Sequence, residues 1–159
     1  MNAAVAGAAA VSTLDSSDQA VEAIRKHFDL NGLSCAEFLI GDAFDILEAK
    51  RREGAMYDGI ILDPPAFTRN KRTVATALKA YRRLNMLAME ALSTDGILIS
   101  ASCSHHIGKQ PFLEMLEASA YRAGRTIRIL EYRGASADHP VSVAMPETEY
   151  LKLAICSVV

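Results

Sequence analysis

Four polar stretches of the sequence carry residue types that could do chemistry, and each directly follows a short apolar run. They are Asp15, Asp42, residues 63–67 (Asp-Pro-Pro-Ala-Phe) and residues 102–104 (Ser-Cys-Ser). Short apolar runs bounded by turn residues predict buried strands. In an open α/β sheet, ligands bind at the carboxyl ends of the strands. The four stretches therefore predict a ligand site at one edge of a sheet.

Asp15 and Asp42 could bind a nucleoside cofactor. A carboxylate at the end of one strand can accept hydrogen bonds from both ribose hydroxyls, and one after the next strand can accept from the exocyclic amine of adenine. Aspartate is also a common cap and turn residue. The alternative is therefore that each residue only begins the helix that follows it.

The loop of residues 63–67 is the more specific signal. Pro64 and Pro65 fix two φ angles and remove two backbone donors, so the loop is rigid and cannot extend the sheet. Such a loop could hold the Asp63 carboxylate against a planar base, and Phe67 could stack on that base. The alternative is a rigid strand-to-helix turn with Phe67 packed into the core.

Cys103 is the candidate nucleophile. It follows a buried strand, has a serine on each side, and lies near His105 and His106. In such a setting a thiolate can be stabilised and reached by a substrate, whereas a structural cysteine usually has apolar neighbours.

A metal site is not predicted. His27 and His139 are isolated in the sequence, and no second Cys/His pair stands at ligand spacing. Cys35 and Cys156 lie inside strand patterns and are interpreted as core residues.

A basic segment follows the candidate loop. Residues 64–89 contain no acidic residue but hold six of the 17 basic ones: Arg69, Lys71, Arg72, Lys79, Arg82 and Arg83. Lys79, Arg82 and Arg83 share one helix face. This face is either an ordinary solvated surface or one that follows the phosphates of RNA.

Composition indicates an ordinary globular domain. The chain has 159 residues, of which 50% are hydrophobic and 23% charged, with a net charge of −2. Its apolar runs are shorter than the roughly 20 residues that cross a bilayer, and its start lacks the basic region of a secretory signal. Three scattered cysteines favour a reducing cytoplasm over a disulfide framework.

Short apolar runs alternate with segments of helical period, which predicts one α/β domain over residues 1–159 with a mostly parallel sheet. The last two strands have no helix between them, so they are expected to pair antiparallel at one edge of the sheet. The expected strands are 10–14, 35–40, 57–62, 97–101, 126–132 and 150–158. The first expected helix begins at Ser16 or Ser17 and ends before Gly32. The other expected helices span 43–52, 73–92 and 109–123.

Taken together, the motifs resemble those of bacterial 23S ribosomal RNA cytosine-5 methyltransferases. Residues 57–67 read YDGIILDPPAF, Tyr81 precedes NMLA at 85–88, residues 96–104 read GILISASCS, and 138–141 read DHPV. The motifs are in order, correctly spaced, and cover essentially the whole chain. Asp-Pro-Pro alone is shared by many methyltransferases, so the combination carries the resemblance.

The resemblance implies a Rossmann-like, class I methyltransferase fold, S-adenosylmethionine (SAM) as cofactor, and 23S ribosomal RNA as partner. It assigns Cys103 as the nucleophile that adds to C6 of a flipped cytosine, and Asp63 as the residue that holds the pyrimidine and the ring charge. Cofactor contacts are expected from Asp15 (ribose), from Asp42 and Ala43 (adenine), and from Asp63. RNA contacts are expected from Pro64, Pro65, Phe67, Arg69, Lys71, Arg72 and Arg82.

The chain also departs from that family. The RNA-binding module, the linking domain, and the first strand with its glycine-rich turn are expected before residues 2–5, so the chain is interpreted as an N-terminally truncated domain. A second copy could pair with the exposed strands, as a homodimer. Two alternatives remain open. One is an exocyclic-amine methyltransferase, which needs no cysteine; the other is a non-catalytic fragment with the same fold.

Overall fold

The chain folds as two compact units, Met1–Ala49 and Lys50–Val159. The computed structural model describes residues 1–68 and 70–159. Helix α3 (Ala43–Arg52) spans the boundary between the units, and its bounds match the predicted helix. Each unit has its own sheet.

The first unit contains two parallel strands, β1 (Val11–Asp15) and β2 (Ala36–Ile40), with Asp15 opposite Ile40. Helix α2 (Asp18–Leu30) connects them. It begins as predicted, because the Ser17 side chain accepts a hydrogen bond from the backbone N–H of Ala20. The short helix α1 (Asn2–Val5) lies in the Ala-rich start, where no helix was predicted. Phe28 is buried and packs edge-on against Phe38, with ring centroids 5.5 Å apart.

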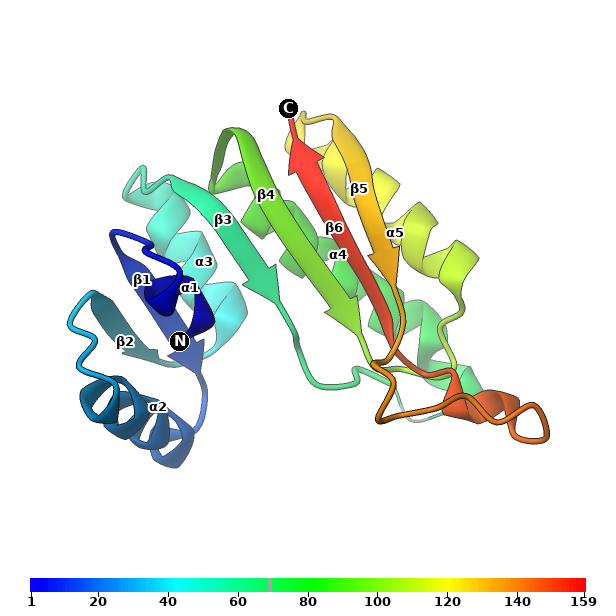
Figure 1. The fold of residues 1–159 in the computed structure, drawn as a ribbon. Helices are drawn as coiled ribbons and strands as arrows, with labels where there is room; N and C mark the ends of the chain where they lie inside the picture. Colours follow the sequence, from blue (N-terminus) through cyan, green and yellow to red (C-terminus); the bar gives the residue numbers. More distant parts are fainter. Residues whose placement is uncertain (69) are drawn as a thin grey trace. The chain divides into compact units, whose positions relative to one another are not determined.

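The second unit contains a four-stranded sheet in the order β3-β4-β6-β5 (Figure 1). The strands are β3 (Tyr57–Leu62), β4 (Leu92–Ser102), β5 (Ile127–Arg133) and β6 (Lys152–Val158). β3 and β4 are parallel, and β6 is antiparallel to both of its neighbours. The predicted antiparallel pairing of the last two strands is confirmed. β6 is the strand that runs against the others, and it lies one position in from the edge strand β5.

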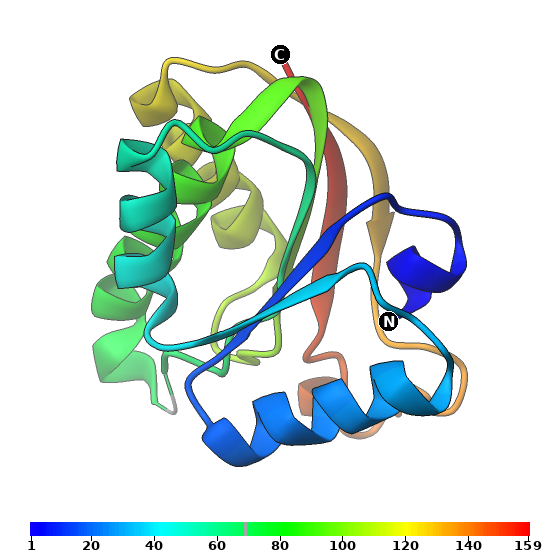
Figure 2. The same cartoon turned by 90° about the vertical axis from the view of Figure 1, so that its left-hand side faces the viewer.

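Helices α4 (Val74–Glu90) and α5 (Lys109–Ala123) pack against each other on one face of this sheet (Figures 1 and 2). α5 ends as predicted, because Gly124 adopts the left-handed conformation that terminates helices. Two short 3₁₀ helices, η1 (Lys71–Thr73) and η2 (Pro146–Thr148), complete the unit. The core between helices and sheet includes the fully buried side chains of Tyr81, Leu84, Met89, Leu98, Phe112, Leu116 and Val158.

The junction of α4 and β4 differs from the prediction of a helix to residue 92 and a strand from residue 97. α4 ends at Glu90 and β4 begins at Leu92, because Leu92 already pairs with Tyr57 of β3. A turn lies within β4, where Asp95 has a positive φ of 61°. Arg125 stabilises the junction: its guanidinium donates hydrogen bonds of 2.9–3.3 Å to backbone carbonyls of four residues, Met89, Leu92, Ser93 and Val158.

In each unit, the first strand along the chain lies at an edge of the sheet: β1 in the first unit and β3 in the second. Within the described residues, β1 pairs only with β2, and β3 pairs only with β4. Such edges present backbone donors and acceptors to a further strand. Pairing with a second copy stays a prediction. No helix in the described part of the chain is both long and apolar enough to span a membrane.

Candidate functional site

The carboxyl ends of β3 and β4 bring two of the predicted motifs together. Leu62 pairs with Ser100, so the chain leaves β3 at Asp63 and leaves β4 shortly before Cys103, at the same end of the sheet. The two loops also bond to each other, because the Ser104 hydroxyl donates a hydrogen bond of 3.4 Å to the backbone carbonyl of Thr68. The rigid loop and the candidate nucleophile therefore form one site within the second unit.

The Asp63 carboxylate is exposed in this site. No hydrogen bond or ion pair is recorded for it among the described residues. Pro64 is half-buried and Pro65 is exposed, as expected for a stiff loop whose tip faces solvent. The carboxylate is thus available to accept hydrogen bonds from a ligand.

The sequence left open whether Phe67 stacks on a base or packs into the core, and the structure has features of both. It is half-buried, and its ring centroid is 4.5 Å from that of the buried Tyr81, with the two rings tilted by 54°. Phe67 is therefore anchored to the core through Tyr81 but retains an exposed part. The adjacent Thr68 is buried, and its hydroxyl donates to the Asn70 carbonyl at 2.7 Å, which fixes this end of the loop.

The predicted RNA-contacting residues beyond the loop divide into two groups. Lys71 and Arg72 are exposed in η1, whose first turn is capped by the Asn70 side chain. Arg69 lies outside the described residues. Arg82 lies farther along, on α4.

Cys103 is half-buried at the end of β4 and is not in a disulfide. The residue on each side of it, Ser102 and Ser104, is buried, so the backbone that carries the thiol is enclosed. His105 and His106 follow, with ring centroids 3.7 Å apart. The thiol is therefore partly accessible on a backbone that packing holds in place.

Lys152 is a residue of this site that sequence reasoning missed. It is only 4% exposed, and its Nζ donates hydrogen bonds to the backbone carbonyls of Ser104 at 2.5 Å and Tyr150 at 2.7 Å. Burial lowers the pKa of its ammonium group to about 8, while the negative charges of Cys103 and Glu149 act in the opposite direction. The signal that could have revealed it is the alternation along β6, where Lys152 falls on the same face as Ala154 and Cys156.

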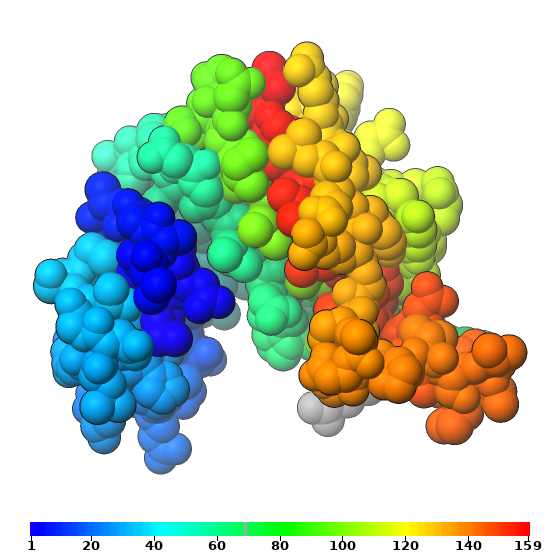
Figure 3. All heavy atoms as spheres, viewed as in Figure 1, coloured from blue at the N-terminus to red at the C-terminus, as the bar shows by residue number. Residues whose placement is uncertain are grey.

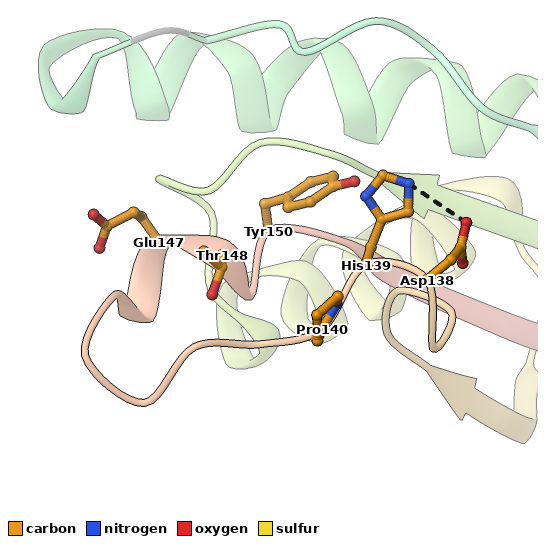
Figure 4. A pocket seen from close by; sticks show the side chains of 6 residues that line it. All are labelled: Asp138, His139, Pro140, Glu147, Thr148 and Tyr150. Atoms are coloured by element: carbon orange, nitrogen blue, oxygen red, sulfur yellow. Dashed lines mark ion pairs between the residues drawn. The ribbon is translucent and has the colours of Figure 1, made fainter.

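The segment between β5 and β6 forms a lobe (Figure 3). It contains a hollow of about 380 Å³ (Figure 4). Asp138, His139, Pro140, Glu147, Thr148 and Tyr150 line it. His139 Nε2 lies 3.7 Å from an Asp138 carboxylate oxygen, and a hydrogen bond from the Ser136 hydroxyl lowers the pKa of Asp138. Because Lys152 bonds to carbonyls of both Tyr150 and Ser104, this lobe adjoins the Cys103 loop.

The first unit places Asp15 and Asp42 at the carboxyl ends of β1 and β2. One oxygen of each carboxylate has a structural role: Asp15 accepts from the N–H of Ser17 at 2.8 Å, and Asp42 accepts from the N–H of Phe44 at 2.8 Å, just after Ala43 begins α3. The turn and cap that the sequence offered as alternatives are therefore present. The second oxygen of each carboxylate has no recorded partner in the described chain and can accept from a ligand.

A basic hollow of about 460 Å³ lies on the helical layer of the second unit. Lys79, Arg82, Arg83 and Met86 of α4 line it together with Arg122 of α5. Arg82 Nε is buried there without a hydrogen-bond partner among the described residues. The predicted basic face of α4 is thus extended by Arg122, which its distance in sequence had concealed.

No group of three or more potential metal ligands occurs within residues 1–68 and 70–159.

Comparison with known proteins shows extensive similarity to ribosomal RNA methyltransferases, although no family model matches the chain. It is 39% identical over 160 residues to ribosomal RNA large subunit methyltransferase I of Serratia proteamaculans, and 36% identical to the protein of that name from Klebsiella pneumoniae. Each alignment covers 99% of this chain and 40% of the relative. The chain therefore spans about two fifths of the length of these curated relatives.

Among solved structures, the chain is similar to SMU.776, which is described as a methyltransferase and was crystallised in complex with S-adenosylhomocysteine (SAH). The TM-score is 0.84 at 27% identity, covering 98% of this chain and 40% of that one. The fold is that of a class I methyltransferase. The Rossmann-like, mostly parallel α/β architecture predicted from the sequence is therefore confirmed.

Proposed function

We propose that this chain is the catalytic part of a SAM-dependent methyltransferase that modifies C5 of a cytosine in large-subunit ribosomal RNA. The observation that carries the proposal is the site at the ends of β3 and β4, where the exposed Asp63 carboxylate and the Cys103 thiol share one bonded pair of loops. Similarity to large-subunit ribosomal RNA methyltransferases over 99% of the chain supports the RNA substrate.

The residues present fit SAM. Asp15 and Asp42 each keep one carboxylate oxygen without a recorded partner, and acceptors are what ribose hydroxyls and an adenine amine require. Asp15 would hold the ribose, Asp42 with Ala43 would hold the adenine, and Asp63 would be a further cofactor contact. When bound, SAM supplies a methyl group on a positively charged sulfur.

Cys103 and Asp63 then perform the chemistry on the pyrimidine. The Cys103 thiolate adds to C6 of the cytosine, which makes C5 nucleophilic enough to take the methyl group. Asp63 holds the ring and stabilises the charge that develops on it. Loss of the C5 proton and cleavage of the bond between sulfur and C6 restore the ring and the thiolate. The products are 5-methylcytosine, SAH and a proton.

Positively charged residues would bind the RNA backbone. Lys71 and Arg72 follow the active loop directly, as does Arg69 in the sequence, and Pro64, Pro65 and Phe67 provide the rigid apolar tip against which a flipped base can rest. The hollow that Arg82 shares with Arg122 offers a second set of phosphate contacts on the helical layer.

A trapping experiment tests the nucleophile. RNA containing 5-fluorocytosine is incubated with the protein and SAM; because fluorine cannot leave C5 as a proton does, the enzyme remains attached to the base. We expect a covalent adduct on Cys103, at least about a thousandfold less in Cys103→Ala, and unchanged in the control Cys35→Ala. An equal adduct in Cys103→Ala contradicts the assignment. Full methylation by that variant, with the methyl on nitrogen, indicates an exocyclic-amine methyltransferase instead.

A further inference from the structure

Lys152 lies on the buried side of β6, where the other residues are apolar. Along β6, Ala154, Cys156 and Val158 are fully buried, whereas the residues between them are half-buried. Lys152 is the first residue on the buried side of the strand and is 4% exposed. A buried ammonium group carries a desolvation cost that an apolar residue avoids, so this lysine must interact strongly with something there.

Its partners connect it to the candidate nucleophile. Lys152 lies opposite Ser102 in the β4–β6 register, and its Nζ donates to the carbonyl of Ser104, so it adjoins the residues on both sides of Cys103. A second hydrogen bond, from Nζ to the Tyr150 carbonyl, joins this backbone to the lobe that contains the Asp138–Tyr150 hollow. Lys152 thus connects the Cys103 loop to the segment between β5 and β6.

We propose that Lys152 is the positioning residue of Cys103: its ammonium group stabilises the Cys103 thiolate and fixes the backbone that carries it. This inference rests on the proposed role of Cys103 as the nucleophile. Lys152 keeps its proton throughout, and the thiol proton passes to solvent.

Electrostatics supports the pairing. The negative charge of Cys103 favours the charged form of Lys152 against the burial that lowers its pKa to about 8. Glu149 also acts on Lys152, His105 and His106 follow Cys103, and Asp63 leaves β3 at the same end of the sheet.

A structural lysine would behave differently. Hydrogen bonds to the Ser104 and Tyr150 carbonyls require donors but no thiolate, and their loss would lower thermal stability without changing how Cys103 ionises. The ionisation of Cys103 is therefore the property that separates the two roles.

The rate of Cys103 alkylation by iodoacetamide, followed by mass spectrometry as a function of pH, measures that property without RNA or SAM. In Lys152→Met we expect the midpoint of the profile to rise by about one pH unit, which makes alkylation at pH 7 about tenfold slower. Lys152→Gln, which keeps donors but no charge, should behave like Lys152→Met. The control is Lys109→Met, because the Lys109 ammonium lies over the Tyr132 ring, 4.3 Å from its centroid, and should leave the profile unchanged. An unchanged midpoint in folded Lys152→Met overturns the proposal.

A reciprocal measurement keeps the test decisive if the Lys152 variants do not fold. In Cys103→Ala the thiolate is absent, so the titration of the Lys152 ammonium, observed by NMR of labelled lysine, should shift to lower pH by a similar amount. An identical titration in Cys103→Ala and wild type overturns the proposal. Failure of the proposed function gives another pattern: methylation survives in Cys103→Ala whatever the alkylation profile shows.

Discussion

The two units hold their candidate residues in different ways. In the second unit, buried polar side chains lie in or next to the candidate site: Thr68, Ser100, Ser102, Ser104 and Lys152. In the first unit, Asp15 and Asp42 are exposed, and backbone N–H groups of the following turns orient them. The proposed catalytic residues are therefore held by packing, whereas the proposed cofactor contacts are oriented by local capping.

The two units also differ in how many large side chains their cores bury. Of the largest fully buried side chains, Phe28 is the one in the first unit, and all the others belong to the second. A pair of strands is marginally stable by itself, while a four-stranded sheet with two packed helices has the core of a stable domain. We infer that the first unit depends more on bound cofactor for its stability, since a ligand stabilises the folded state that binds it.

Truncation of one aromatic side chain in each core should give the largest difference. Phe112→Ala leaves a cavity between α5 and the sheet and should destabilise the second unit by about 3–5 kcal/mol. Phe28→Ala should cost a similar amount but act on the first unit alone. The fully buried Cys156 thiol reports on the second unit, so its labelling by a thiol reagent should accelerate at least about a hundredfold in Phe112→Ala. It should not change in Phe28→Ala; equal acceleration in both variants would show that the units unfold together.

Substitution of Asp15 or Asp42 should weaken cofactor binding without affecting the Cys103 thiol. Asp42→Asn preserves an oxygen that can cap α3 but replaces the second oxygen with a donor, so we expect SAH to bind about tenfold more weakly with little change in stability. Asp42→Ala should bind equally weakly and in addition lose about 1 kcal/mol of stability, because the cap is gone.

Calorimetric titration with SAH measures the binding, and Cys103→Ala is the matched control, since its change lies in the second unit. The same affinity for SAH in Asp42→Asn and wild type would mean that capping is the whole role of Asp42.

Local signals predicted the elements, and tertiary contacts decided what the sequence could not show. Ser17, Gly124 and the apolar run before Asp63 set the ends of α2, α5 and β3, because caps and buried runs are properties of neighbouring residues. The early start of β4 depends on Tyr57, 35 positions away from Leu92 along the chain, and was missed.

The site residues likewise divide into those that local signals predicted and those that tertiary contacts revealed. Asp63 and Cys103 could be placed at one edge because strand ends carry recognisable motifs. Lys152 was missed despite the alternation along β6, since a lysine at the start of a strand is normally exposed and its burial is accompanied by bonds to Ser104 and Tyr150. Arg122 was missed because packing of α5 on α4 is what brings it to the basic face.

The smallest expected effect is a pH dependence of stability confined to the second unit, which holds Lys152, the buried charged residue of the described chain. Its pKa of about 8 in the folded state lies below the ordinary 10.5, so the unfolded chain binds the additional proton between these values. Stability should therefore rise with pH in that range, by about 1 kcal/mol between about pH 8 and 9.

Burial of Cys156 acts in the opposite sense at higher pH. It raises the pKa of this thiol from 9.0 to about 11, so the folded state keeps a proton that the unfolded state loses, and stability falls with pH across that interval. Denaturant titrations at several pH values should show the rise in wild type and in Cys156→Val, and its loss in Lys152→Met. If stability still rises with pH in Lys152→Met, another group causes the rise. The pH dependence would then no longer distinguish the second unit from the first.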